Sequence, residues 1–168
     1  MKGNDALEKE LTYTRFDRMS ERYPDRPAVV FLGEPFSYAR LRDLSERFAG
    51  ALEALGVRKG DRVMLYLPNS IQWVIAWLGI QKLGAVMVPV SPIYTSFEIE
   101  YMLKDSGAET VICQDTNYGY VREAFDKTGL KRVIVTNLAD LLPFWKRSLG
   151  LLFDRIPHGK VNRDAGVY

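Results

Sequence analysis

Short apolar runs alternate with helical patterns along most of the chain, and this alternation limits the possible folds more than any other feature. Residues 62–67 (Arg-Val-Met-Leu-Tyr-Leu) form a continuous apolar run, which is typical of a strand in a sheet covered on both faces. Similar runs follow at residues 85–90, 109–113 and 132–136. Strands separated by helices in this order predict right-handed crossovers and a mostly parallel sheet with helices on both sides.

Apolar residues at steps of three and four predict the helices. The strongest stripe begins after residue 39 and contains Leu41, Leu44, Phe48, Leu52 and Leu55. Further helices are expected between Ser70 and Gly84, at residues 96–105 and at residues 118–127. We expect the following residues to cap or end them: Ser37, Asn69 or Ser70, and Ser96 at amino ends, and Gly56, Gly84 and Gly107 at carboxyl ends.

The first part of the chain has a different pattern. Leu11, Phe16, Met19 and Tyr23 recur at roughly helical spacing and predict a surface helix. This helix should end by Tyr23, because Pro24 disfavours helical backbone in the residue before it. Residues 28–32 and 36–38 then predict a β-hairpin, with Gly33-Glu34-Pro35 as turn residues.

Together these patterns predict a three-layer α/β domain with a mostly parallel sheet flanked by helices and an N-terminal hairpin. We expect residues 1–137 to form an α/β subdomain, and residues 138–168 to form an amphipathic helix and a polar tail that leads to a missing remainder. No strand or helix pattern closes the sequence before Tyr168, which is typical of a fragment of a longer protein.

The composition excludes several classes of protein. The chain has 23 basic and 21 acidic residues, and this near balance argues against nucleic acid as a partner. The apolar stretch at residues 71–80 is too short to span a membrane and predicts a buried helix. Cys113 is the single cysteine and lies in an apolar run, so we expect a buried thiol and a reducing, cytoplasmic location.

No residue pattern identifies a catalytic, cofactor-binding or metal-binding residue. The sequence contains neither G-x-G-x-x-G nor G-x-x-x-x-G-K-[ST], and a single Cys and a single His make a zinc site very improbable. We expect His158 to be a solvated loop residue. Capping, turn formation and solvation account for Asp61, Asp105 and Asp115 without catalysis.

Two aromatic features leave alternatives open. Trp73 and Trp77 lie four residues apart on one helical face, where core packing is the simpler interpretation and the wall of an acyl-chain pocket the alternative. The stripe in residues 138–153 predicts either a helix packed on missing parts of the domain or peripheral contact with an anionic membrane. The membrane contact would be made by Trp145, Lys146, Arg147, Leu149 and Phe153.

Four stretches, in this order and at this spacing, resemble the adenylate-forming superfamily. They are residues 24–29 with 36–41, residues 55–63 with 67–69, residues 84–92, and Tyr94-Thr95 with residues 98–99 and 103–108. The resemblance covers residues 12–137. Pro92-Ile93-Tyr94-Thr95 and the run from Leu103 to Ala108 are most similar to the long-chain fatty acid–CoA ligase branch.

The resemblance implies that a carboxylate reacts with ATP to give an acyl-adenylate and pyrophosphate, and that coenzyme A then forms the thioester. It implies ATP, Mg²⁺ and coenzyme A as cofactors and a fatty acid as substrate. We also expect a homodimer. The phosphate loop, the adenine and ribose contacts and a C-terminal lysine of the family lie beyond the matched part. We therefore expect residues 1–168 alone to be inactive.

Other functions stay open at this point. An aryl acid, a short-chain acid or an amino acid could replace the fatty acid within the same family. The chain could instead be a free-standing binding or regulatory domain that keeps the fold without catalysis. A flavodoxin-like nucleotide-binding protein is disfavoured, because no phosphate-binding loop follows the first strand of the expected parallel sheet.

Overall fold

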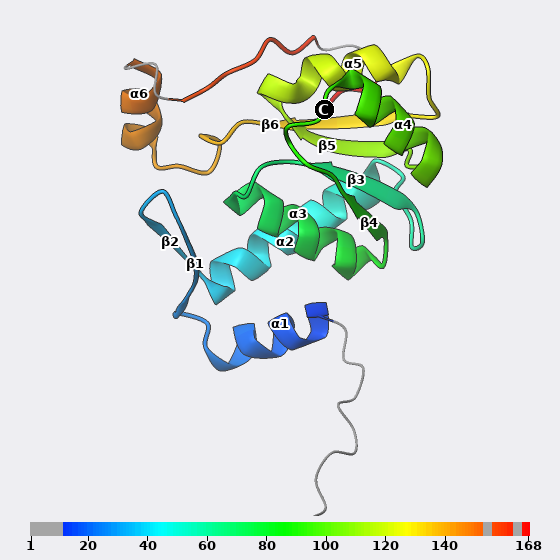
Figure 1. Ribbon diagram of the computed structural model, residues 1–168. Helices are drawn as coiled ribbons and strands as arrows, with labels where there is room; N and C mark the ends of the chain where they lie inside the picture. The colour runs from blue at the N-terminus through cyan, green and yellow to red at the C-terminus, as the bar shows by residue number, and fades with distance from the viewer. Residues whose placement is uncertain (1–11, 153–155, 163–165) are drawn as a thin grey trace, which may run out of the picture.

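The computed structural model describes residues 12–152, 156–162 and 166–168 (Figure 1). Its centre is a four-stranded parallel sheet built from β3 (Arg62–Tyr66), β4 (Val86–Pro89), β5 (Thr110–Gln114) and β6 (Arg132–Thr136). The strand order is β4-β3-β5-β6, so that β3 and β5 lie in the middle. The mostly parallel sheet predicted from the apolar runs is confirmed.

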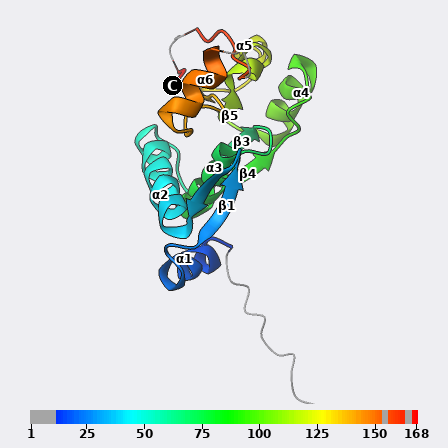
Figure 2. The same ribbon diagram turned by 90° about the vertical axis from the view of Figure 1, so that its left-hand side faces the viewer.

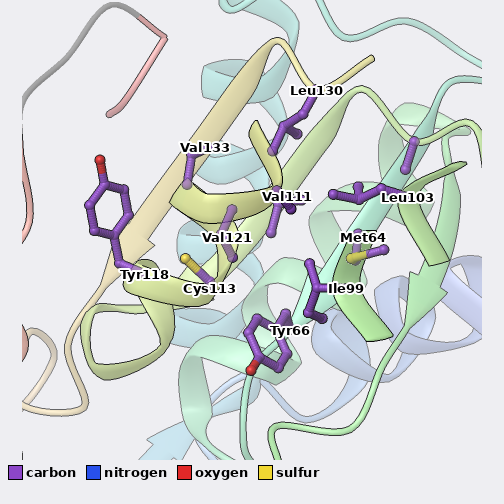
Figure 3. Packing of buried hydrophobic residues seen from close by; sticks show 12 residues of the cluster. Met64, Tyr66, Ile99, Leu103, Val111, Cys113, Tyr118, Val121, Leu130 and Val133 are labelled. Atoms are coloured by element: carbon purple, nitrogen blue, oxygen red, sulfur yellow. The ribbon is translucent and has the colours of Figure 1, made fainter. Parts of the chain in front are cut away.

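Two layers of helix cover the two faces of this sheet. On one face, α2 (Tyr38–Ala54) and α3 (Ile71–Leu83) pack on a core that includes Val63, Leu65 and Ile112. On the other face, α4 (Ser96–Ser106) and α5 (Tyr118–Phe125) enclose a second core. Figure 3 shows the second core, in which Ile99 of α4 and Val121 of α5 point toward the strands.

Local chemistry fixes the helix ends. Ser37 Oγ accepts from the backbone N–H of Arg40 at 3.3 Å, and Ser70 Oγ accepts from that of Trp73 at 3.2 Å, as the sequence predicted. The predicted cap at Ser96 is wrong. Thr95 occupies the cap position, and its backbone N–H donates to Glu98 Oε2 at 2.9 Å in a capping box.

The amino-terminal part forms a helix and a separate two-stranded sheet. Helix α1 (Thr12–Arg22) ends before Pro24 as predicted, whereas Leu11 lies outside the described residues. Strands β1 (Pro27–Phe31) and β2 (Glu34–Ser37) form the predicted antiparallel hairpin. Its turn consists of Leu32 and Gly33, and Glu34 and Pro35 belong to β2 instead of the turn.

The carboxyl-terminal part differs from the long helical stripe expected from the sequence. Helix α6 (Phe144–Leu152) begins only after Pro143, because this proline disfavours helical backbone in the residue before it. A short 3₁₀ turn, η1 (Asp115–Asn117), also lies between β5 and α5. Near the end of the chain, Val167 forms a parallel bridge with Val133 of β6. The proposed division at residue 137 stays a prediction.

Helices α2 and α3 approach each other closely at Gly79, which is buried within α3. A Cβ atom at this position would lie 2.9 Å from Phe48 Cδ1 and 3.1 Å from the backbone oxygen of Ser45. Gly50 is also helical, but it is exposed and has no atom within 4 Å of an added Cβ. The two glycines thus have opposite roles, one as a contact surface and the other as a replaceable helix residue.

We expect Gly79→Ala to destabilise the chain by about 1–3 kcal/mol, because the new methyl group overpacks the contact between the helices. Gly50→Ala should instead stabilise it by about 0.5–1 kcal/mol, because alanine restricts the unfolded chain without a clash. Urea unfolding of both variants measures the difference. Equal effects of the two substitutions would contradict the close packing of α2 on α3.

Candidate functional site at the carboxyl edge of the sheet

The carboxyl edge of the parallel sheet is the candidate site. After β3, the chain forms β4, which lies beside β3 on one side. It then crosses to form β5, which lies beside β3 on the other side. The carboxyl ends of β3 and β5 therefore form a switch point, where open α/β sheets characteristically bind their ligands. The described residues form two hollows near this edge, one beside α2 and α3 and one beside β6.

The first hollow is an apolar cavity of about 350 Å³ between α2, α3 and the strand ends. Leu67, Ile112 and Ile134 of the sheet side and Phe48 of α2 line it, and a few polar groups lie at its margin. An apolar cavity with a few polar groups is the usual form of a small-molecule site. The complete lining is Leu44, Arg47, Phe48, Ala51, Leu67, Gln72, Ile75, Ala76, Ile112, Ile134, Thr136, Asp140 and Leu141.

Gln72 is the notable polar residue of this cavity. It is buried, and its Nε2 donates to the backbone oxygen of Asn137 at 2.8 Å, which ties α3 to the end of β6. Its Oε1 has no hydrogen-bond partner among the described residues. A buried carbonyl without a donor is costly, so this oxygen would favour a ligand or a segment that brings an N–H or O–H group.

The second hollow, of about 490 Å³, lies on the other side of β6 and is more polar. Asp115 organises its margin, because its Oδ2 accepts from Asn137 Nδ2 at 2.9 Å and from the Gly159 backbone N–H at 3.0 Å. Its Oδ1 accepts from the Thr116 backbone N–H at 2.9 Å. The carboxylate therefore holds residues 156–162 against the ends of β5 and β6.

A second carboxylate shapes the loop after β6. Asp140 Oδ2 accepts from the backbone N–H of Asn137 at 2.8 Å and from Thr136 Oγ1 at 2.9 Å. The sequence reasoning did not single out Gln72, Asn137 or Asp140. An Asn three residues before an Asp, directly after a predicted strand, was the available signal for the turn. No sequence pattern could identify Gln72, because its hydrogen-bond partner lies 65 positions away.

Cys113 and His158 are titratable groups that the sequence suggested, and Tyr66 is a further buried one. Burial raises the pKa of the Cys113 thiol to about 12, so the thiol stays protonated near neutral pH as expected for a core residue. Tyr66 donates its hydroxyl to the backbone oxygen of Tyr94, and burial raises its pKa too. His158 is exposed, and its Nδ1 lies 3.5 Å from the backbone oxygen of Ile156.

Apart from Asp115, the other candidates fit their expected roles. Asp61 Oδ2 accepts from the Arg58 backbone N–H at 2.8 Å and closes the turn before β3, and Asp105 is exposed on α4. Trp73 and Trp77 have ring centroids 5.9 Å apart and pack against the core beneath α2 and α3. Neither lines the 350 Å³ cavity, which favours core packing. Asp115 exceeds a capping role, because it also accepts hydrogen bonds from Asn137 and Gly159.

The described residues contain no cluster of side chains for a metal ion. Within residues 12–152, 156–162 and 166–168, no group of three His, Cys, Asp or Glu side chains could hold a metal ion. Across the same ranges, none of the helices is long and apolar enough to cross a membrane. The arrangement can bind an apolar group beside hydrogen-bonding atoms. The expectation that the chain contains no catalytic residue stays a prediction.

Comparison with known proteins places this fold in a family. A family model described as AMP-binding enzyme matches residues 16–149. A long-chain-fatty-acid–CoA ligase of Escherichia coli O157:H7 is 38% identical over 135 residues, which are 80% of this chain and 24% of that protein. The crystal structure of a long-chain-fatty-acid-CoA ligase from Archaeoglobus fulgidus matches with a TM-score of 0.72 and 25% identity, over 99% of this chain and 36% of that one.

A benzoate CoA ligase from Burkholderia xenovorans LB400 matches with a TM-score of 0.71 and 25% identity, over 93% of this chain and 32% of that chain. The fold is thus that of the acyl-CoA ligases. The chain belongs to the AMP-binding enzyme family, and the resemblance noted in its sequence is confirmed. It spans about a quarter of the length of the curated relatives that it matches.

We expect Asp115→Ala to release residues 156–162 from the sheet, because the Gly159 N–H and two further N–H donors, of Asn137 and Thr116, lose their acceptor. The Gly159 amide should exchange its hydrogen faster, and the free energy of unfolding should fall by about 1–3 kcal/mol. Asp126→Ala is the matched control, since Asp126 is exposed and forms a surface ion pair with Arg122. Unchanged exchange at Gly159 in Asp115→Ala would contradict this role.

Proposed function

We propose that these residues belong to a carboxylate–CoA ligase that forms AMP and acts on a long-chain fatty acid. The observation that carries the proposal is the 38% identity to a long-chain-fatty-acid–CoA ligase over 80% of this chain. The whole enzyme would join the carboxylate to coenzyme A with release of AMP and pyrophosphate from ATP. An alignable fold over nearly the whole chain supports the same class of enzyme.

We assign no cofactor of this reaction to the described residues. They provide no cluster of metal-ligating side chains for Mg²⁺. The sequence also contains no glycine-rich phosphate loop that could cradle the phosphates of ATP. We therefore assign ATP, Mg²⁺ and coenzyme A to other parts of the whole enzyme, and we assign no chemical step to residues of this chain.

The contribution of this chain would be structural and binding. Its two buried cores would hold the carboxyl edge of the sheet in a fixed position. The 350 Å³ cavity would offer an apolar surface for a ligand beside Gln72. Aryl, short-chain and amino acids are alternative substrates of the same reaction. The benzoate ligase matches the fold at the same identity as the Archaeoglobus fulgidus ligase, which supports testing aryl acids. A homodimer and a cytoplasmic location stay predictions.

The proposal predicts different activities for the chain and for the whole gene product that contains it. With ATP, Mg²⁺, coenzyme A and fatty acids, the 168-residue chain should release no pyrophosphate, because we expect the phosphate loop of the family to lie beyond the part that matches. The whole gene product should release pyrophosphate and form acyl-CoA, most efficiently with long-chain fatty acids. A coupled pyrophosphate assay with matched series of fatty, aryl and amino acids measures both.

Two results would contradict this account in different ways. AMP formation by the purified 168-residue chain would show that catalytic groups lie within it. A whole gene product that is folded but inactive with every carboxylate would exclude the ligase, and would favour the binding or regulatory domain. Preference for an aryl acid would keep the reaction and change the substrate.

A further inference from the structure

Two outlying helices, α1 and α6, are tied to the domain by ion pairs. For α6, Lys146 Nζ lies 2.6 Å from Glu34 Oε1 and donates to the backbone oxygen of Leu32 at 3.1 Å. This contact leaves Trp145 and Arg147 as exposed members of the membrane contact expected from the sequence, which stays a prediction. Its other members, Phe153 and the side chain of Leu149, lie outside the described residues. A larger set of charges ties α1.

Helix α1 has little buried apolar surface of its own. Ser20 is the single buried residue in residues 12–22, and the apolar side chains of Phe16 and Met19 are half-buried. Beneath the helix lies a hollow of about 280 Å³, which Phe16 and Met19 share with β1, α2 and α3. A helix that lies over a hollow makes fewer van der Waals contacts than a closely packed one, so burial alone holds α1 weakly.

The backbone of α1 also makes few connections to its surroundings. Between described residues, it makes no hydrogen bond to the hairpin, α2 or α3. Directly after the helix, the N–H of Tyr38 donates to the Arg26 oxygen at 3.0 Å, and that of Ala39 donates to the Pro24 oxygen at 2.9 Å. Residues 24–26 are therefore fixed to the start of α2, and α1 extends from this base. Figures 1 and 2 both show α1 at the outer end of the domain, beyond α2.

Side-chain charges connect α1 to the two helices next to it. Asp17 Oδ1 lies 2.9 Å from Arg42 Nε of α2, and Glu21 Oε1 lies 3.8 Å from Arg42 Nη1. Arg42 Nε also lies 3.3 Å from Glu46 Oε1, and the same oxygen accepts from Lys82 Nζ of α3 at 2.6 Å. These five side chains form the α1 ion network.

Arg42 is the centre of the α1 ion network, because it pairs with three carboxylates. Asp17 Oδ1 is buried and has no hydrogen-bond partner among the described residues, so charge rather than hydrogen-bond geometry holds it at Arg42. The hydrogen bond from Lys82 lowers the pKa of Glu46, which therefore stays charged at neutral pH. Without Arg42, three carboxylates would face one lysine and would repel one another.

We propose that α1 is a lid, which opens as a unit over the 280 Å³ hollow and which the α1 ion network holds shut. All five side chains of the network are partly exposed, so dissolved salt weakens their attraction. Opening would uncover the walls that Leu41 of α2 and Trp77 of α3 contribute to the hollow. The proposal concerns contacts among residues 12–82 and is independent of the proposed ligase function.

The direct test is native-state hydrogen exchange of the 168-residue chain at two NaCl concentrations. At low salt, the amides of residues 16–22 should exchange about a hundredfold faster than those in the middle of α2, because opening of one helix costs less than global unfolding. A rise from about 0.05 M to about 0.5 M NaCl should speed exchange in α1 by about fivefold, because salt screens the network. Exchange of α1 only through global unfolding, or without salt dependence, would overturn the proposal.

Arg42→Met should reverse the effect of salt. Exchange in α1 should be about tenfold faster than in the unchanged chain at low salt, because the carboxylates lose their central cation. Added NaCl should then slow exchange, because it screens repulsion instead of attraction. Arg42→Lys keeps the positive charge and should keep the original direction of the salt effect. The same salt response in Arg42→Met as in the unchanged chain would contradict a lid held by charge.

Two carboxylates of similar geometry separate the network from general loosening of the fold. Asp17→Asn should speed exchange in α1 of the unchanged chain, and should slow it in Arg42→Met, where Asp17 only repels its neighbours. Asp43→Asn is the matched control, because Asp43 pairs with Arg47 at 3.0 Å within α2 and lies outside the network. It should leave exchange in α1 unchanged. Equal acceleration by Asp17→Asn and Asp43→Asn would overturn the proposal, and no readout here depends on ligase activity.

Discussion

The parallel pairing of β3 with β5 is the interaction on which the rest of the structure depends. Residues 63–66 of β3 are fully buried, and their side chains alternate between the two helical layers. Val63 and Leu65 belong to the core under α2 and α3, whereas Met64 and Tyr66 belong to the core under α4 and α5. Water cannot reach this backbone, so its N–H and C=O groups depend on the neighbouring strands for hydrogen bonds. One strand thus joins both cores.

The candidate site follows from the same arrangement. Because β3 lies between β4 and β5, its carboxyl end forms the switch point of the sheet. Gln72 at the start of α3 and Asn137 after β6 meet there through a 2.8 Å hydrogen bond, although neither is near the other in sequence. The fold therefore brings polar groups to the edge of an apolar cavity.

Much of this fold could be predicted from the sequence, because its signals are local. The buried strand at residues 62–67 and the caps at Ser37 and Ser70 depend on neighbouring residues. Thr95 was missed because Ser96 is an equally plausible cap, and only the contact with Glu98 distinguishes them. The turn at Leu32-Gly33 was displaced in the prediction because leucine is rare in left-handed backbone.

The candidate site was less predictable, for a physical reason. Gln72, Asp115 and Lys146 form hydrogen bonds with residues that are distant in sequence. Hydrophobic periodicity and motif spacing therefore cannot predict these contacts. The family resemblance supplied the activity of the relatives but no catalytic residue for this part. Long-range hydrogen bonds and ion pairs become visible only when the sheet has brought the elements together.

Native-state hydrogen exchange tests the central claim most directly, because it reports the stability of each backbone amide. If β3 and β5 hold the two cores together, the amides of Met64, Leu65 and Ile112 should exchange only through global unfolding, and those of α6 much faster. The slowest amides should then report one common free energy. Exchange at β3 as fast as at α6, or separate free energies for the two sides of the sheet, would contradict the account.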